Sequence, residues 1–462
     1  MTIPAPEIFK AYDIRGIVGK TLTAEAVRAI GQALGSEAAA RGQRTVAIGR
    51  DGRLSGQELA AALAAGLNAA GIDVLDIGCV PTPLSYFAAY QLGTNSAVSV
   101  TGSHNPPDYN GLKMVLGGDT LYGEQIQALR KRIETGDLVH AKKPGKLTKA
   151  DVRKAYLERI LSDVKLARPM KIVVDCGNGV AGELAPELFR RMGCEVVPLF
   201  CEIDGNFPNH HPDPSKPENL RDVIRALKET DAELGLAFDG DGDRLGVVTK
   251  DGEIIYPDRQ LMLFAADVLT RNPGAQIIYD VKCSRNVALS VRHQGGKPLM
   301  WQTGHAIIKA KLKESGAPLA GEMSGHVFFK ERWYGFDDGL YAGARLLEIV
   351  SRWSDANWPL KHLPNALSTP ELNIKMQEGE PHTLVDKLIR DCAKLFPGAT
   401  ELNTIDGVRA EYADGFGLAR ASNTTPVIVL RFEADSALAL KRIQEEFKRA
   451  LLAVWPQLDV RF

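Results

Sequence analysis

The sequence lacks an excess of charge of either sign. Its 56 lysines and arginines face 57 aspartates and glutamates, for a formal net charge of -1. Proteins that bind nucleic acid or an anionic membrane through charge carry a basic surplus. The average composition therefore excludes a general polyanion binder. It leaves open a small phosphorylated ligand, which depends on local charge.

The sequence also lacks a long apolar run. The longest stretch without a charged residue, 77–107, contains prolines, glycines, asparagines and His104, which is unlike a membrane span. The first residues, MTIPAPEIFKAYD, do not combine a basic segment with an apolar one, as a secretory signal would. We expect a cytoplasmic protein with no membrane partner.

Cysteine is scarce and scattered. No two cysteines form a C-x-x-C pair, which is typical of reduced thiols rather than of a disulfide framework or a zinc site. The six are Cys79, Cys176, Cys194, Cys201, Cys283 and Cys392.

A repeated pattern of strands and helices is present instead. At roughly 100–200 residues per domain, 462 residues suggest about three or four domains. Three copies of one pattern open with a strand and a small-residue turn at 45–56, 171–182 and 276–287. The pattern predicts three similar α/β domains with parallel or mixed sheets. In the first copy, Ser55 and Glu58 form a potential capping box before the alanine-rich run that follows.

The third strand of each copy ends in a polar loop that contains glycine. These loops lie at 98–106, 236–244 and 319–326. Because ligands bind beyond the carboxyl ends of strands in open α/β sheets, we expect the three loops to face one central cleft.

The last hundred residues differ, with short strands and two amphipathic helices, and they predict a smaller α+β domain. The resulting domains are 1–150, 151–251, 252–366 and 367–462.

The segment FDGDGDR, 238–244, is a candidate metal site. Asp239, Asp241 and Asp243 alternate with glycines, whose flexible backbone lets three carboxylates converge on one hard cation. An EF-hand is excluded because Arg244 and Lys250 stand where it requires glycine and glutamate. Three carboxylates suit Mg²⁺ that also contacts a phosphoryl oxygen, and Arg244 could hold that phosphate.

The segment TGSHNPP, 101–107, offers an exposed serine, Ser103. It is not a G-x-S-x-G nucleophile elbow, because Asn105 replaces the second glycine. An ordinary polar turn is the competing interpretation. Lys113 follows closely enough to act near the same serine.

Three further loops carry groups suited to a sugar phosphate. GEMSGH and QTGH provide hydroxyl-binding candidates, and LARASNTTP combines a guanidinium with hydroxyls, an amide and backbone N–H groups that suit a dianion. Each loop alone is also compatible with a structural turn. The candidates are Gly304, His305, Glu322, Ser324, His326, Arg420, Ser422, Asn423, Thr424 and Thr425, with Tyr12, Arg15, Lys282, Arg285 and Arg431 as further phosphate or sugar contacts.

These loops, in this order, resemble the α-D-phosphohexomutase superfamily, from YDIRG at 12–16 to RASNTTP at 420–426. The resemblance implies four domains in a heart shape, three of them alike, with the active site in a central cleft and a fourth domain that rotates to close it. Met323 in the sugar loop argues against the phosphoglucosamine mutase branch.

The resemblance also implies the roles of the site residues. Ser103 would carry a phosphoryl group, and Asp239, Asp241 and Asp243 would hold Mg²⁺ with the phosphoserine as a further ligand. Arg15, Lys113 and Arg244 would lie beside the phosphoserine. Glu322 and Ser324 would bind sugar hydroxyls, and the loop at Arg420 would bind the phosphate that is not transferred. The general acid or base stays open among Lys113, His305, His326 and Arg15.

The implied activity is reversible phosphoryl transfer between the 1- and 6-positions of hexose phosphates, in the mannose and glucose series. It would proceed through hexose 1,6-bisphosphate as intermediate and activator. The alternatives are a Mg²⁺-dependent sugar phosphatase, a phosphoglucosamine mutase and a non-catalytic sugar-phosphate-binding protein. The partners would be small hexose phosphates, and the oligomeric state stays open, with a monomer as one option.

Overall fold

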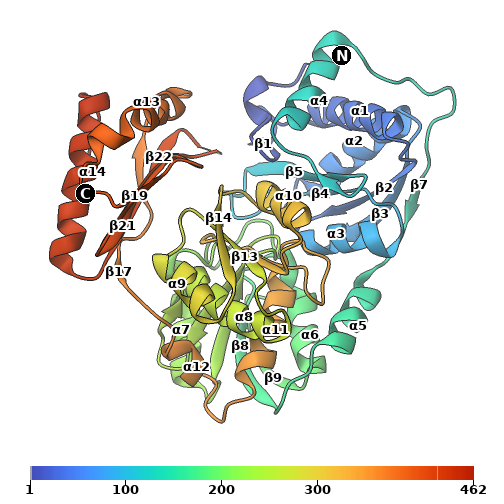
Figure 1. The fold of residues 1–462 in the computed structure, drawn as a ribbon. Coiled ribbons are helices and arrows are strands. Elements are labelled where there is room, and N and C mark those ends of the chain that lie inside the picture. The colour runs from blue at the N-terminus through green and yellow to red at the C-terminus, as the bar shows by residue number, and fades with distance from the viewer. Residues whose placement is uncertain (1–2, 424) are drawn as a thin grey trace.

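The computed structural model describes residues 3–423 and 425–462, which form four domains, each built on its own β-sheet. Figure 1 shows the first domain in blue on the right and the fourth in red on the left, with the second and third between them. The four-domain α/β architecture predicted from the sequence is confirmed. None of the helices formed by the described residues is both long and apolar enough to cross a bilayer.

The first domain is a sheet covered by helices on both faces. Along β2, Val46 and Ile48 pack with α1 and α2, whereas Ala47 packs on the opposite face with α3, as the two-residue period of a strand requires. The domain contains a short 3₁₀ turn (Pro6–Ile8), β1 (Ile14–Ile17), α1 (Ala24–Ala40), β2 (Thr45–Arg50), α2 (Gly56–Ala69), β3 (Asp73–Cys79), α3 (Thr82–Gln91), β4 (Ala97–Val100), β5 (Tyr109–Leu116), β6 (Asp119–Thr120), α4 (Glu124–Thr135) and β7 (Leu147–Lys149).

The second and third domains repeat the central four strands of the first. The strand orders are β5-β4-β2-β3, β11-β10-β8-β9 and β16-β15-β13-β14. Counted along the chain, the first strand of each set is parallel to the second and to the third. The fourth strand is antiparallel to the third. The threefold repeat predicted from the sequence is therefore confirmed.

These two domains comprise the elements from α5 to α12. The second domain contains α5 (Arg153–Asp163), β8 (Met170–Asp175), α6 (Leu184–Arg191), β9 (Cys194–Leu199), α7 (Arg221–Glu229), β10 (Leu234–Phe238), β11 (Leu245–Thr249), β12 (Ile254–Ile255), and 3₁₀ turns at Val180–Gly182 and Pro217–Leu220. The third contains α8 (Pro257–Arg271), β13 (Gln276–Asp280), α9 (Arg285–His293), β14 (Lys297–Trp301), α10 (His305–Ser315), β15 (Leu319–Gly321), β16 (Val327–Phe329), α11 (Gly339–Val350) and α12 (Trp358–Lys361).

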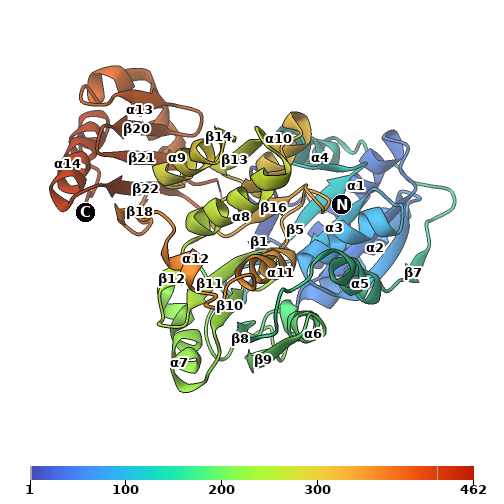
Figure 2. The same cartoon turned by 60° about the horizontal axis from the view of Figure 1, so that its bottom comes forward.

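The fourth domain is an antiparallel sheet with two helices on one face, which confirms the predicted α+β unit. Both helices pack on β21, and Figure 2 shows them on the outer side of the molecule. The elements are β17 (Leu367–Ser368), β18 (Leu372–Lys375), α13 (Glu380–Leu395), β19 (Glu401–Asn403), β20 (Val408–Tyr412), β21 (Gly415–Ala421), β22 (Val427–Ala434) and α14 (Ala437–Val454).

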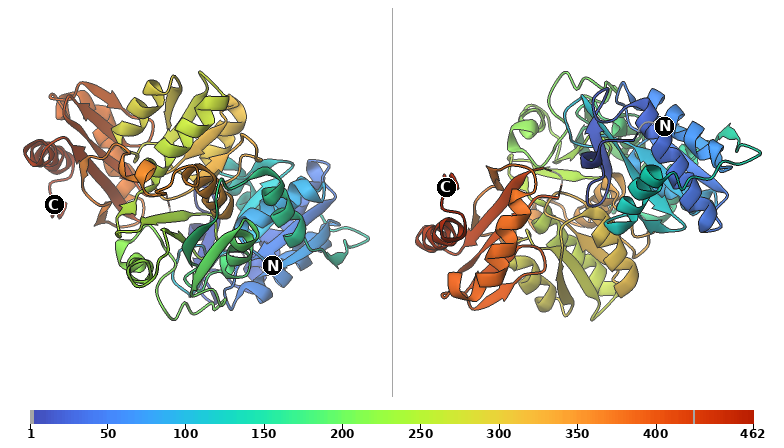
Figure 3. Two further views of the ribbon diagram at one scale, coloured as in Figure 1. Left: turned by 90° about the horizontal axis from the view of Figure 1, so that it is seen from below. Right: turned by 90° about the horizontal axis from the view of Figure 1, so that it is seen from above.

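One apolar core links the first three domains, the first domain has a further core of its own, and the fourth domain has a separate one. The shared core includes α3 and α5 near the first domain, the second sheet, and α8 and α11 of the third. Every residue of α11 is buried, and this helix packs against β10, β11 and β16. The views from below and above in Figure 3 show the fourth domain set off to one side.

The capping box expected at Ser55 is wrong. Ser55 precedes α2 but its side chain caps no backbone N–H; its Oγ instead accepts a hydrogen bond from Asn110 Nδ2 at 2.9 Å. A tertiary hydrogen bond with β5 therefore takes the place of the expected local cap of α2. Thr23, Ser284, Asp338 and Ser436 do cap their helices through the side chain.

Asp338 gives the fold a testable pH dependence. Its carboxylate caps α11 by accepting from the Tyr341 N–H and also lies 2.9 Å from the Tyr156 hydroxyl. Burial, together with the neighbouring charge of Asp337, raises its pKa to about 7. An acid whose pKa is raised by folding stabilises the fold fully below its unfolded pKa, and this contribution is lost as the pH rises through the folded value.

We expect Asp338→Asn to become more stable relative to the parent protein as the pH rises from about 4 to about 7. The gain is about 1.4 kcal/mol per pH unit, because only the parent must keep a buried carboxyl protonated. Urea unfolding at pH 5 and pH 7 measures it. Asp386→Asn, at an exposed position of α13, is the matched control. An equal pH dependence of both variants would contradict the assignment.

Candidate active site

The three predicted loops meet at the centre of the molecule. The loop after β10 carries the aspartates, and the N–H of Leu245, which begins β11 directly after this loop, donates to Gly325 O of the third-domain loop at 3.2 Å. On its other side it lies against the serine loop. A Cβ at Gly240 would come within 2.4 Å of Ser103 O, so only glycine permits this approach. The loops of the first and third domains thus both contact the aspartate loop.

Ser103 is held in an uncommon backbone conformation. Its φ of 49° lies in the left-handed region, which non-glycine residues rarely adopt. Arg53 fixes the loop, because its guanidinium donates to Ser103 O at 2.9 Å and to Asn105 O at 2.6 Å. The Ser103 Oγ then lies 3.1 Å from Asp239 Oδ2 and 3.1 Å from His104 Nδ1. The expectation of an exposed serine is wrong, because Ser103 is buried and its hydroxyl faces the first aspartate of the candidate metal loop.

Asp51 holds the same loop through hydrogen bonds and an ion pair. Its Oδ2 accepts from Gly102 N–H at 3.0 Å and from the Thr101 hydroxyl at 2.8 Å, and it forms an ion pair with Arg53 Nε at 3.3 Å. Because burial disfavours its charge, the pKa of Asp51 is raised despite Arg53. The serine loop is thus anchored by a buried aspartate–arginine pair.

Asp239, Asp241 and Asp243 bring one carboxylate oxygen each within 4.8 Å of one another, and all three are fully buried. Burial and the two neighbouring charges raise the pKa of Asp239 well above its usual value. Although burial opposes ionisation, Lys113 holds the pKa of Asp241 far below its usual range. Lys113 Nζ lies 2.8 Å from Asp241 Oδ2 and 2.5 Å from Asp243 Oδ2.

The donor set of this cluster fits a magnesium ion. Three carboxylates are hard oxygen ligands. Asp241 Oδ1 and Asp243 Oδ1 are buried and have no hydrogen-bond partner among the described residues. With all three carboxylates ionised, the negative charge exceeds what Lys113 and Arg244 together balance, and a divalent cation would offset the excess.

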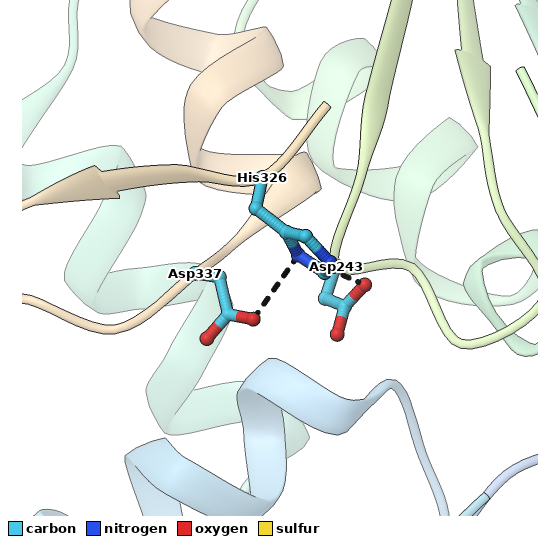
Figure 4. A group of neighbouring side chains, drawn as sticks. All are labelled: Asp243, His326 and Asp337. Carbon is cyan, nitrogen blue, oxygen red and sulfur yellow. Dashed lines mark ion pairs between the residues drawn. The ribbon is translucent and has the colours of Figure 1, made fainter. Parts of the chain in front are cut away.

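His326 lies between two aspartates, as Figure 4 shows. Its Nδ1 is 3.1 Å from Asp337 Oδ2 and 3.4 Å from Asp243 Oδ1, and its Nε2 accepts from Arg244 Nε at 3.1 Å. Asp337 also receives a hydrogen bond from Lys309 Nζ at 2.8 Å. Lys309 and Asp337 therefore connect His326 to helix α10.

His305 and Tyr12 form the neighbouring part of the site. Their rings meet edge to face with centroids 5.2 Å apart. Burial and the nearby Lys309 hold the pKa of His305 well below its usual value, so its imidazole is neutral. Glu322 Oε1 accepts from Gly304 N–H at 2.6 Å, and burial raises the pKa of this carboxyl.

Arg420 reaches this region from the fourth domain. Its Nε donates to Asp406 Oδ2 at 2.9 Å, and the same oxygen accepts from Thr303 N–H at 3.0 Å. One guanidinium nitrogen of Arg420 is buried with no hydrogen-bond partner among the described residues. Ser422 and Thr425 follow in the hairpin turn between β21 and β22, with hydroxyl oxygens 3.0 Å apart. Asn423 shares that turn, whereas Thr424 lies outside the described residues.

The remaining basic candidates fall into two groups. Arg15 Nη1 donates to Asn105 Oδ1 on the serine loop. Lys282, Arg285 and Arg431 instead join the third and fourth domains, through Glu371, Asp435 and Asp258. Burial opposes the charge of Lys282, but Glu371 and Asp280 raise its pKa. Ser324 lies half-buried in the third-domain loop.

Sequence reasoning missed five residues of this network. Asp51, Arg53, Thr82, Lys309 and Asp337 are all buried. Thr82 Oγ1 donates to Asp241 Oδ2 at 2.7 Å. Asp51 directly follows the first strand of the first repeat, so the repeat pattern in the sequence could have indicated this residue. Lys309 lies within α10 and Asp337 lies just before α11, and no sequence motif marks either residue.

Comparison with known proteins covers the whole chain. Four family models match: phosphoglucomutase/phosphomannomutase α/β/α domain I at residues 6–140, domain II at 154–252, domain III at 256–366 and the C-terminal domain at 371–450.

Relatives are similar over their full length. A phosphomannomutase/phosphoglucomutase of Pseudomonas aeruginosa is 57% identical over 100% of this chain and 98% of its own. A phosphoglucomutase of Neisseria gonorrhoeae is 58% identical over 97% and 98%. The crystal structure of a phosphoglucomutase/phosphomannomutase family protein from Burkholderia thailandensis has a TM-score of 0.94 and 63% identity, covering 99% of this chain and 100% of that one.

Arg53→Met tests how the serine loop is held. The substitution keeps the apolar stem but removes the ion-pair partner of Asp51 and the side-chain donor to several loop carbonyls. We expect a loss of roughly 3–5 kcal/mol in the free energy of unfolding, as for a broken buried ion pair. Urea unfolding measures it, with Arg28→Met on the exposed face of α1 as control. Equal stability of the two variants would show that Arg53 does not support the loop.

Proposed function

The chain belongs to the phosphoglucomutase/phosphomannomutase family, and we propose that it transfers a phosphoryl group reversibly between the 1- and 6-positions of mannose and glucose phosphates. Ser103 carries the group as phosphoserine, and hexose 1,6-bisphosphate is the intermediate and activator. The enzyme is an isomerase. The observation that carries the assignment is Ser103 Oγ lying 3.1 Å from Asp239 Oδ2 where three domain loops meet.

The cations around Ser103 support this role. A phosphoserine and a hexose phosphate each carry close to two negative charges at neutral pH, so their approach requires compensation. Lys113, Arg15 and Arg244 supply positive charge from the first and second domains. Lys113 keeps its proton, because burial is outweighed by the surrounding aspartates and its pKa is raised. We therefore assign Lys113 and both arginines to charge stabilisation.

Asp239, Asp241 and Asp243 would hold Mg²⁺, with the phosphoserine as a further ligand. The bound ion would neutralise charge on the transferring phosphoryl group. Asp241 is oriented by Thr82 and Lys113, and Asp239 accepts from Asp243 N–H and Arg244 N–H at 3.1 Å each. These hydrogen bonds fix the direction of the carboxylates.

His326 is our candidate for moving the proton of the attacking hydroxyl. Arginine stays protonated in proteins, which excludes Arg15 as a base. His305 is neutral, but its Nδ1 lies 3.9 Å from Asp337 Oδ2, farther than the 3.1 Å of His326 Nδ1. His326 has Asp337 behind its Nδ1, an arrangement that stabilises an imidazolium after proton transfer.

The non-transferred phosphate would bind in the fourth domain, at Arg420 with Ser422, Asn423, Thr424 and Thr425. Lys282 lies close enough to Arg420 and Glu322 for their charges to influence one another, so it can contribute from the third domain. Glu322 and Ser324 would bind sugar hydroxyls, with Tyr12, Gly304 and His305 beside them. Arg285 and Arg431 would orient the fourth domain through their ion pairs.

The bisphosphate must turn round between the two transfers, so that its other phosphate faces Ser103. A distal phosphate site that tolerates either orientation of the sugar explains how one cleft performs both steps. Rotation of the fourth domain would retain the intermediate and keep water from the phosphoserine.

We further propose the domain limits 1–150, 151–251, 252–366 and 367–462, and a cytoplasmic location. The scattered, unpaired cysteines support that location, because all six are free thiols. Small hexose phosphates are the proposed partners.

Ser103→Ala tests the phosphoryl carrier. With glucose 1-phosphate or mannose 1-phosphate and trace hexose 1,6-bisphosphate, we expect 6-phosphate formation to fall by roughly 10³-fold or more, because the acceptor oxygen is gone. Intact-mass analysis should show one phosphoryl group on a fraction of the parent protein and none on the variant. Turnover equal to the parent would refute the carrier role. Release of free phosphate without 6-phosphate would instead identify a sugar phosphatase.

Asp241→Asn tests the metal loop. We expect loss of Mg²⁺ binding in calorimetric titration and a fall in turnover of at least about 100-fold, because a ligand charge is removed and Lys113 loses a partner. Circular dichroism should show an unchanged fold. Asp386→Asn at an exposed site is the control. Unchanged affinity for Mg²⁺ would place the ion elsewhere.

A further inference from the structure

Two thiols lie against one another beside the metal loop. Cys176 directly follows β8 and Cys201 follows β9, two parallel neighbours in which Asp175 pairs with Leu199. The two Sγ atoms are 3.8 Å apart. No disulfide joins them, since both cysteines are free. A disulfide has an S–S distance of about 2.05 Å, so a modest approach of two loop residues would form one.

The two thiols differ in exposure and acidity. Cys176 is completely buried, whereas Cys201 is half-buried. The contact with Cys176 lowers the pKa of the Cys201 thiol, while the contact with Cys201 and burial raise that of Cys176. Because peroxide must reach the sulfur that it oxidises, the less buried Cys201 is the nucleophile, and Cys176 beside it is the partner that resolves it.

We propose that Cys176 and Cys201 form a site of oxidative modification, at which hydrogen peroxide converts the two thiols into an intramolecular disulfide. The Cys201 sulfur attacks one peroxide oxygen, the O–O bond breaks, and the departing hydroxide takes a proton to leave as water. The sulfenic acid formed on Cys201 is then attacked by the Cys176 sulfur. The S–O bond breaks, and hydroxide leaves with the Cys176 proton as a second water. Two thiols are oxidised and one peroxide is reduced.

The disulfide would act on the active site through the turn after Cys176. Cys176 O accepts from Gly179 N–H at 2.6 Å, and the next residue, Val180, donates its N–H to Gly240 O of the metal loop at 3.1 Å. On the other side, Asn178 N–H donates to Phe200 O at 2.7 Å, next to Cys201. Drawing the two sulfur atoms together would shift this turn, and with it Gly240, which packs against Ser103. We therefore expect the disulfide to lower turnover reversibly.

The experiment uses the full chain, reduced and freed of reductant, then exposed to hydrogen peroxide. Remaining thiols are alkylated under denaturing conditions and located by peptide mass mapping. We expect a peptide pair linked through Cys176 and Cys201, with the loss of two hydrogens from the intact mass, reversed by dithiothreitol. Oxidation at Cys79 or Cys392 that leaves both thiols free for alkylation would overturn the proposal. Stable sulfinic acid on Cys201 would do the same.

Variants separate the two roles. Cys176→Ser should leave a sulfenic acid on Cys201 that dimedone traps, whereas Cys201→Ser should protect Cys176 from peroxide. Cys392→Ser, at a half-buried thiol of α13, should form the linked peptide as the parent does. If either serine variant fails to fold, the linkage map of the parent protein still decides the question.

The effect on turnover is a separate measurement, because it rests on the proposed function whereas the linkage map does not. Turnover of the parent should fall on oxidation and return with dithiothreitol, and Cys201→Ser should show neither change. Full turnover with the linked peptide present would refute the coupling to the metal loop.

Discussion

The arrangement of the domains depends on the burial of several carboxylates at one point. Asp239, Asp241, Asp243 and Asp337 are all fully buried at the junction of the first three domains. An uncompensated buried charge costs several kcal/mol, so each must find a cation or hydrogen-bond donor. The compensating groups include Lys113 from the first domain and Lys309 from the third. The same interactions that assemble the proposed site therefore hold three domains in register.

Much of the site could be predicted because its chemistry is local in the sequence. The three aspartates of the candidate metal loop stand within five residues, and Ser103 lies in a loop that the repeat places at the same end of its sheet. The repeat was detectable because each copy alternates strand and helix in one order, and the structure preserves that order in three sheets. Short polar motifs at the ends of apolar strands thus identified the centre of the molecule.

What could not be predicted depends on contacts between distant segments. Asp337 lies next to Asp338, a helix cap, and only folding shows that it contacts His326 and Lys309. Arg53 has no motif, yet its side chain crosses to the carbonyls of the serine loop. Ser55 begins a capping-box sequence, but its hydroxyl accepts a hydrogen bond from Asn110 on β5 instead of capping α2. In each case a tertiary neighbour decides the role of the side chain.

The buried helix α11 has a consequence for the order in which the chain acquires its structure during synthesis. It packs on the second sheet but begins only at Gly339, long after the last strand of that sheet ends at Ile255. The second domain therefore cannot complete its apolar core until residue 350 has emerged from the ribosome. The fourth domain closes around its own cluster of side chains. Its folding can follow as an independent event, while the second and third domains, which share the core around α11, consolidate together.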